Sequence, residues 1–323
     1  MRMNQVIYKI KKVLKYFCFQ WQFFWFAPQK LYTISFIRMI LCGLYFVLYI
    51  ERQVNFESYY SDHGYVAIQQ VAQAHLAPYS EKWLFVYPSD SVAYWAHLTY
   101  LFVLLLLFLG IGGRKMTWAA FLLHISFMHR NPIINYGVDM YFVFWLLYLS
   151  MIQNNRFFSV INLLPRYRGQ FAGSSRGDLL SSVGIRFFQL QLVISYVYAG
   201  FDKLKGSTWW QGSAAWNALI NYQFNPIDWS SLKAVPLLVV VATYGTLIYE
   251  IYSPFGFFSP KLRKWWIMMG VIFHLSILFM MGLIFFGLMM AVSVLIFVRS
   301  DELRGLFQII KKKIQLLPLV ASE

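Results

Sequence analysis

Lys203 is the side chain in the sequence with the clearest capacity for proton chemistry. It ends a long apolar run in the segment Tyr198-Ala199-Gly200-Phe201-Asp202-Lys203-Leu204, and Trp209 follows closely. A lysine that is withdrawn from water gives up its proton more readily, and the neutral amine can act as a general base. Lysines at the ends of apolar helices also extend their amines back to the membrane surface. The sequence leaves both interpretations open.

His274 is a second candidate, because it stands near the middle of another apolar run, between Phe273 and Leu275. A single histidine in an apolar helix most often forms a hydrogen bond to a neighbouring helix. At neutral pH it could also donate a proton or stabilise an oxyanion. Both roles need other groups close to the ring, which the sequence alone does not identify.

A third group lies where one apolar run ends and the next begins. Arg130 and Asn131 precede Pro132, which ends a helix, and Asp139 follows after Gly137, which permits a turn. We expect Arg130 and Asp139 to form an ion pair across this turn. The pair would either close a re-entrant hairpin or form, with Asn131, a polar floor that orients a substrate.

Arg38 and Glu250 are charged residues inside two further apolar runs. Their estimated depths are similar, so we expect a buried structural ion pair. Signatures of metal and nucleotide chemistry are missing from the sequence, which contains no HExxH, no Walker loop and no paired CxxC. The histidines have no tight ligand spacing, and we therefore expect no metal site.

The composition indicates the class of protein to which these residues belong. Of 323 residues, 59% are hydrophobic and only 13% are charged, whereas a soluble domain has about 25% charged residues. A soluble fold could not bury so much apolar surface. The formal net charge of +15 would suggest nucleic-acid binding in a soluble protein, but in a membrane protein it is typical of basic cytoplasmic loops. We expect no nucleic-acid partner and no structural disulfide from the two cysteines.

The sequence predicts an all-α, polytopic membrane bundle with about eight transmembrane helices. The expected spans are residues 32–50, 92–111, 115–134, 138–153, 184–201, 234–252, 264–281 and 282–298. Residues 31–300 form the transmembrane domain in this interpretation. It is flanked by a basic amphipathic segment at 1–30 and a basic amphipathic tail at 301–323, both expected to bind the membrane surface or, alternatively, a partner.

The distribution of basic residues predicts the orientation. With eight spans, most of the 28 Lys and Arg residues fall on the same side as both termini, which by the positive-inside rule is the cytoplasm. Lys203 and the segments 51–91, 130–138 and 202–233 then lie at the extracytoplasmic side. The tryptophans of the last segment, Trp209 among them, either belong to an interfacial belt or cover a site.

The order of these residues also resembles a known family. Arg130-Asn131-Pro132, Gly137, Asp139, the block Ala199-Gly200-x-x-Lys203-Leu204 with Trp209 and Gly212, then Glu250 and His274, is similar to the HTTM family, the membrane domains related to vitamin K-dependent γ-carboxylase. The resemblance covers residues 31 to 300. The Ala-Gly-x-x-Lys-Leu block is its most specific part.

The resemblance implies a function at the extracytoplasmic face of a bacterial cell membrane. In the carboxylase, the matching lysine deprotonates a reduced quinone, vitamin K, so Lys203 would be the base and a reduced quinone the cofactor. His274 would stabilise charge, and Arg130, Asn131, Asp139, Asp202 and Trp209 would shape the pocket. The length matches bacterial members tied to production of a secreted peptide toxin, which implies a peptide precursor as substrate.

Two departures from the carboxylase pattern affect this expectation. Pro132 stands where the carboxylase has a histidine, and only a short tail follows the last apolar run, so peptide recognition is expected to need a small partner protein. A non-catalytic scaffold that holds the precursor and a partner together is the alternative. A transporter is disfavoured, because the sequence shows no duplicated half.

Overall fold

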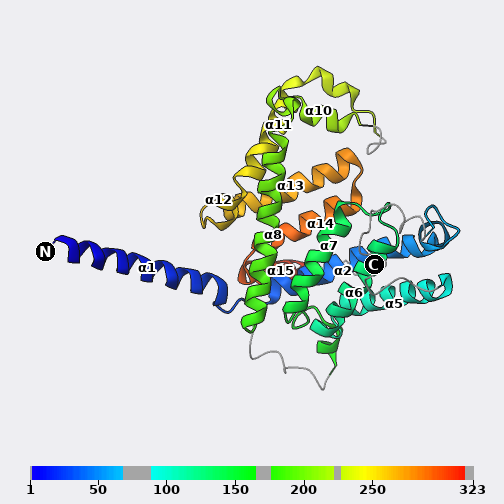
Figure 1. Ribbon diagram of the computed structural model, residues 1–323, viewed down its shortest axis with the longest axis horizontal. Helices are drawn as coiled ribbons and strands as arrows, with labels where there is room; N and C mark the ends of the chain where they lie inside the picture. Colours follow the sequence, from blue (N-terminus) through cyan, green and yellow to red (C-terminus); the bar gives the residue numbers. More distant parts are fainter. Residues whose placement is uncertain (1, 68–88, 165–175, 222–226, 317–323) are drawn as a thin grey trace.

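The protein is mainly helical in the residues that its computed structural model describes, which are 2–67, 89–164, 176–221 and 227–316. Figure 1 shows a bundle crossed by the long helix α8, with α1 projecting away from it. The α-helices are α1 (Arg2–Phe26), α2 (Tyr32–Val54), α3 (Phe56–Tyr60), α5 (Asp90–Phe108), α6 (Gly113–Arg130), α7 (Gly137–Met151), α8 (Leu179–Lys203), α9 (Ser207–Trp210), α10 (Ala214–Leu219), α11 (Pro236–Ile251), α12 (Ser253–Phe258), α13 (Arg263–Met281), α14 (Ile284–Val294) and α15 (Ser300–Leu316). Short 3-10 helices span Val160–Leu163, Ser230–Ala234 and Leu295–Phe297.

The prediction of an apolar helical bundle is confirmed, whereas the number of spans is not. Each of the eight predicted runs contains a helix, but among the described residues only α2, α5, α8 and α13 are long and apolar enough by themselves to cross a membrane. A fifth span results if residues 284–297 and 300–313, bent by 112° at their break, are counted as one. Helices α7 and α11 are apolar but shorter, so eight spans remain a prediction.

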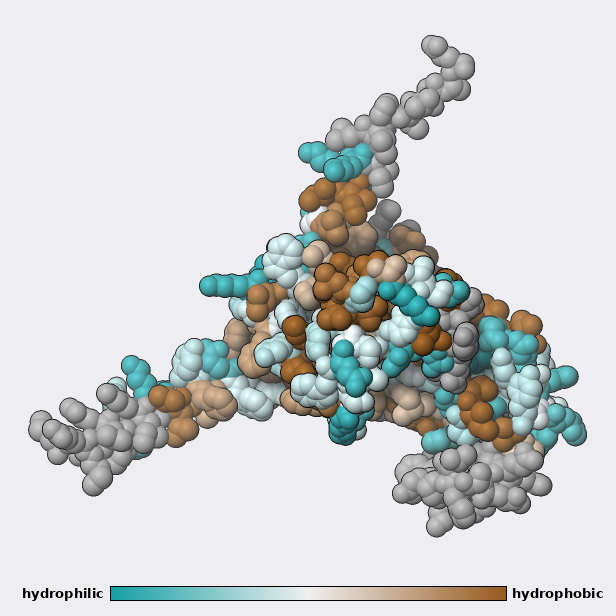
Figure 2. Space-filling view, turned by 90° about the horizontal axis from the view of Figure 1, so that it is seen from above, coloured by the Kyte–Doolittle hydropathy of each residue, from teal (hydrophilic) through white to brown (hydrophobic). Residues whose placement is uncertain are grey.

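The outward faces of the helices are apolar, which supports a membrane environment. On α11, Leu237, Val241 and Ile248 are all more than half exposed, and on α13 Trp265 and Ile272 are similarly exposed. Figure 2 shows such apolar residues reaching the surface between polar ones. A soluble monomer rarely exposes apolar side chains at this density along several helices, because water makes such contact unfavourable.

Both predicted amphipathic ends are helical in the parts that the structure describes, but they meet the bundle differently. Helix α1 leaves Phe17 and Trp21 exposed and contacts α8 only near its own end, where Trp25 lies against Phe187. Helix α15 instead packs along the bundle through Phe307, whose ring contacts those of Tyr32, Phe36 and Phe158.

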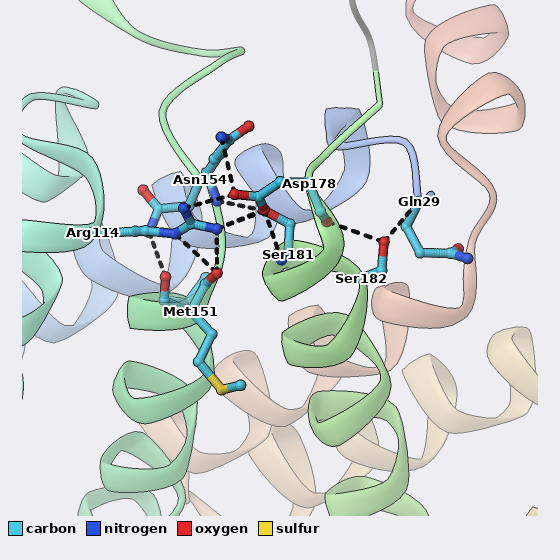
Figure 3. Close-up of polar contacts among 9 residues, drawn as sticks. Gln29, Arg114, Met151, Asn154, Asp178, Ser181 and Ser182 are labelled. Atoms are coloured by element: carbon cyan, nitrogen blue, oxygen red, sulfur yellow. Dashed lines mark hydrogen bonds and ion pairs between the residues drawn. The ribbon is translucent and has the colours of Figure 1, made fainter. Parts of the chain in front are cut away.

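The start of α8 is held by a polar latch formed by Arg114, Asp178 and Ser181, shown in Figure 3. Arg114 donates to both carboxylate oxygens of Asp178 at 2.9 and 2.7 Å, and to the carbonyl oxygen of Met151 at the end of α7. Asp178 also accepts from the backbone amide of Ser181 and so caps α8. One guanidinium therefore joins α6, α7 and α8.

We expect the latch to make stability depend on pH. The hydrogen bonds from Arg114 hold the pKa of the Asp178 carboxyl well below its usual value, so the folded state binds this proton more weakly than the unfolded chain does. The stabilisation is present above the unfolded pKa of about 4 and is lost as the pH falls below it. Thermal unfolding in detergent between pH 3 and 7 should show a smaller pH dependence for Asp178→Asn than for the unchanged protein. Equal slopes would contradict this assignment.

Close packing between α12 and α13 depends on Gly256. A Cβ atom at this position would lie 2.1 Å from the indole ring of Trp266, which is shorter than any van der Waals contact. Trp266 in turn lies against Tyr249 of α11, with its ring nitrogen donating to the Tyr249 carbonyl oxygen at 3.3 Å. The absent side chain of Gly256 thus allows three helices to meet.

We predict that Gly256→Ala lowers the free energy of unfolding by about 1–3 kcal/mol, because the added methyl group forces the indole to move. Gly245→Ala on α11 is the matched control, since a Cβ there meets nothing within 4 Å. It should be neutral or stabilising by up to about 1 kcal/mol, because alanine favours helix. Chemical or thermal unfolding of the purified variants checks both values, and equal effects would refute the packing argument.

Candidate functional site

Lys203 lies at the end of α8 and forms an ion pair with Glu250 of α11. Its Nζ atom is 2.9 Å from Oε1 and 2.8 Å from Oε2 of the carboxylate. The Glu250 side chain is 5% exposed, whereas that of Lys203 is 26% exposed. The carboxylate is therefore enclosed, whereas the Lys203 side chain is partly exposed.

Two neighbours define the environment of this pair. Gly200, one turn before Lys203, allows α8 and α11 to approach closely, since a Cβ there would lie 2.7 Å from Ile251 and 3.2 Å from the Glu250 Cβ. On the open side, the Lys203 amine lies 5.5 Å from the ring centre of Trp209, a cation–π distance. Trp209 thus lies beside Lys203, and Glu250 is the ion-pair partner of this lysine.

Asp202 does not join this site. Its carboxylate pairs with Lys205 at 2.8 Å, and both side chains are exposed. An exposed pair of this kind is screened by water and contributes little to stability. Asp202 therefore has Lys205, and not Lys203, as its ion-pair partner.

The predicted ion pair between Arg38 and Glu250 is wrong. Arg38 is fully buried and donates to the carbonyl oxygens of Leu107, Phe108, Phe157 and Phe158. These carbonyls belong to the last turn of α5 and to the segment after α7. The guanidinium is thus surrounded by backbone dipoles, while Glu250 has Lys203 as its counter-charge.

His274 of α13 is 2% exposed, and its Nε2 atom lies 2.7 Å from the hydroxyl oxygen of Tyr196 on α8. Its other ring nitrogen, Nδ1, is buried and has no hydrogen-bond partner. This contact between neighbouring helices matches the structural role that the sequence left open. The rings of Phe273 and Phe286 also contact the imidazole, so it is enclosed by aromatic side chains.

Lys203 and the partner of His274, Tyr196, lie at different heights along α8. Lys203 and His274 therefore do not face a common position. Tyr196, Gly200 and Lys203 follow one face of α8 at helical spacing, and Tyr196 and Lys203 are separated by about 10 Å of helix rise. Tyr249, next to Glu250 on α11, packs against Tyr196 with ring centres 5.3 Å apart. Aromatic side chains therefore lie between the two predicted catalytic groups.

Asp139 belongs to a separate cluster, which we call the Asp139 cluster, with Arg52, Tyr45, Tyr136 and His124. Arg52 donates to the two carboxylate oxygens at 2.9 Å each, and both side chains are almost fully buried. The Tyr45 hydroxyl and the Tyr136 amide also donate to the carboxylate. The ring of His124 lies 3.0 Å from the Asp139 carbonyl oxygen through Nε2. Four donors thus satisfy a carboxylate that has no access to water.

The predicted pairing of Arg130 with Asp139 is also wrong. Arg130 pairs with Asp62 at 3.0 Å, because the carboxylate of Asp139 points into the bundle towards α2. Asn131 is fully buried and donates to the carbonyl oxygen of Tyr59 at 2.7 Å. These two residues tie the end of α6 to the segment after α2.

Sequence reasoning missed Arg52 because the apolar run ends near residue 50, which placed Arg52 in a loop. Helix α2 continues to Val54, and its residues Tyr45, Tyr49 and Arg52 share one face at spacings of four and three. That spacing was the available signal. Tyr196 carried no comparable signal, because its importance comes from its contact with His274, which is 78 residues away in the sequence.

The residues around Lys203 and His274 do not fit a quinone cofactor in this arrangement. The amine of Lys203 already faces a carboxylate, and the aromatic rings of Tyr196, Tyr249 and Phe273 fill the space towards His274. A cavity of about 390 Å³ is lined by Lys30, Arg186 and Arg263 among others, at the opposite end of α8. Among the described residues no group of three or more His, Cys, Asp or Glu could hold a metal ion.

Comparisons with family models, with characterised proteins and with solved structures found no match to this chain. The resemblance to the HTTM family therefore depends on the motif residues named above and stays a prediction.

The Asp139 cluster yields a stability prediction. Asp139→Asn leaves the Arg52 guanidinium buried without a counter-charge, and should destabilise the protein by about 3–5 kcal/mol. Replacing both residues, as Arg52→Met with Asp139→Leu, should recover much of the loss, because it removes the uncompensated charge. Asp202→Asn is the control at an exposed pair and should have little effect. Unfolding curves of the four proteins in one detergent provide the measurement. A double variant as unstable as Asp139→Asn would contradict the explanation.

Proposed function

We propose that the chain is an integral membrane protein that takes part in the maturation of a secreted peptide, with Lys203 as the base. The observation that carries this proposal is the Lys203–Glu250 pair, in which the carboxylate is enclosed and the lysine side chain, beside Trp209, is partly exposed. Buried ionisable pairs in apolar helices are costly and commonly mark functional sites. The motif resemblance supplies the substrate class, a peptide precursor at the extracytoplasmic face of a bacterial membrane.

The geometry supports a specific route for the proton. Lys203 in its ammonium form cannot act as a base, so its proton must first pass to a neighbouring acceptor. Glu250 is within hydrogen-bond distance at 2.9 Å and can take that proton, which leaves a neutral amine and a neutral carboxyl. The amine then accepts a proton from the substrate. The pair now carries one net positive charge, an ammonium beside a neutral carboxyl, and this charge balances the negative charge left on the substrate. His274 lies too deep among aromatic side chains to contact the same substrate atom.

A scaffold is the second candidate function, and the same pair favours it in one respect. An ion pair between α8 and α11 also stabilises the bundle without any proton transfer. In that case the protein would hold a peptide precursor and a partner protein together, and the exposed Trp210 beside Trp209 would offer part of the contact. The two functions differ in whether the amine must lose its proton.

Lys203→Arg separates the two functions. Arginine keeps the positive charge and the ion pair with Glu250, but its guanidinium does not lose a proton in proteins. We expect this variant to be present in the membrane at normal abundance and to lower the yield of mature peptide at least about 100-fold, the usual scale for removal of a general base. The secreted product is measured by mass spectrometry in a producing strain.

Two further variants complete the experiment. Lys205→Arg changes a lysine whose side chain is 76% exposed and pairs only with Asp202 among the described residues, and it should leave the peptide unchanged. Lys203→Ala tests loss of the pair itself. If Lys203→Arg matures the peptide normally, the enzymatic function is refuted. If only Lys203→Ala fails, the pair is structural and the scaffold is supported.

A further inference from the structure

The cavity of about 390 Å³ lies where α1 and α15 join the bundle, and its walls are strongly basic. Its volume is within the usual range for small-molecule pockets, about 300–1,000 Å³. Five cationic side chains line it, against a single acidic side chain, Asp301. The cationic residues are Lys30, Arg176, Arg186, Arg263 and Arg299.

The charges of this cavity are only partly balanced within the protein. Lys30 pairs with Asp301 at 2.7 Å. Arg263 and Arg299 share one carboxylate, that of Glu302, at 2.9 and 3.0 Å. One glutamate therefore serves two guanidinium groups, and a net positive charge remains at the cavity wall.

Arg186 and Arg263 also have hydrogen-bonding capacity that faces no acid. Arg186 donates to the carbonyl oxygen of Phe24 and to the side-chain oxygen of Gln189, both at 2.7 Å and both neutral. No carboxylate pairs with Arg186 in the part of the chain that the structure describes. The Nε atom of Arg263 is buried and has no hydrogen-bond partner. A buried donor of this kind is costly unless a ligand or water satisfies it.

The uncharged part of the lining is mixed, with polar residues such as Gln189 and Ser300 beside apolar ones. Ile34, Ile185, Phe257 and Phe297 are buried core residues that form the floor of the cavity. A free inorganic anion gains no favourable contact with this apolar floor, whereas the glycerol and first acyl carbons of a lipid can cover it. The pocket therefore combines guanidinium groups, which bind phosphate oxygens well, with a surface suited to hydrocarbon.

The position of the cavity supports the same ligand. Pro28 and Lys30 follow the aromatic helix α1, and Ser300 and Asp301 begin the basic helix α15, so both amphipathic helices converge on this site. Amphipathic helices with aromatic and basic residues lie at the headgroup level of anionic membranes. A pocket between the end of α1 and the start of α15 is then at the depth of lipid phosphates.

We propose that the cavity bounded by Lys30, Arg186, Arg263 and Arg299 is a binding site for a phosphate group carried by an anionic phospholipid. The ammonium and guanidinium groups bind the phosphate oxygens, and the apolar floor contacts the lipid beyond its headgroup. This site is separate from Lys203 and does not depend on the function proposed for that residue.

The test uses the full-length protein purified in a mild neutral detergent and titrated with phosphatidylglycerol, with bound lipid counted by native mass spectrometry. We expect saturable binding of one lipid and at least about tenfold weaker binding of phosphatidylcholine, whose headgroup has no net charge. Arg186→Gln and Arg263→Gln, on different elements of the lining, should each weaken phosphatidylglycerol binding about tenfold, the usual scale for loss of a charged hydrogen bond. Lys115→Gln removes the same charge from an exposed position on α6 outside the lining and should change nothing.

The remaining outcomes are decisive in either direction. Displacement of the lipid by millimolar inorganic phosphate would assign the phosphate chemistry to a free anion, whereas resistance to it would assign the site to lipid. Equal binding of the two lipids overturns the proposal. So does unchanged binding by both arginine variants when their melting temperatures match that of the unchanged protein. If Arg186→Gln fails to fold, Arg263→Gln and the charge-preserving Arg186→Lys carry the test.

Discussion

The bundle depends on one constraint, which is that every charge withdrawn from water must meet an opposite charge or a set of aligned dipoles. The Arg52–Asp139 pair shows this most clearly, because both side chains are buried and four donors surround the carboxylate. Helices α2 and α7 are brought into register by that requirement. Tyr45 and Phe142 then stack with ring centres 3.7 Å apart and complete the contact between these helices.

The same constraint is met differently elsewhere. Arg38 has no carboxylate among its partners and is held by four carbonyl oxygens from two distant segments. Glu250 is balanced by Lys203, which remains partly exposed. The first arrangement is closed and suits a structural role, while the second leaves one partner reachable. That difference in access, and not burial alone, is why Lys203 is the better candidate for chemistry.

Composition and apolar periodicity were sufficient to predict the helical class and the approximate position of each main helix. They were not sufficient for the partners of the charges. Depth along a run predicted that Arg38 would meet Glu250, but partners are set by how each helix is rotated and by where helices can approach closely. Gly200 allows α11 to approach α8 so that Glu250 meets Lys203, and Asp139 faces α2 instead of Arg130. These contacts join residues far apart in sequence, so the spacing of residues along the chain does not reveal them.

The four carbonyl acceptors around Arg38 have a consequence for how the protein is made. Two of its acceptor carbonyls belong to Phe157 and Phe158, more than a hundred residues after the arginine in the chain. During synthesis α2 emerges long before them, so its guanidinium has no complete shell of acceptors until the ribosome has passed residue 158. The packing of α2 is therefore complete only after α7 and the segment that follows it have been synthesised.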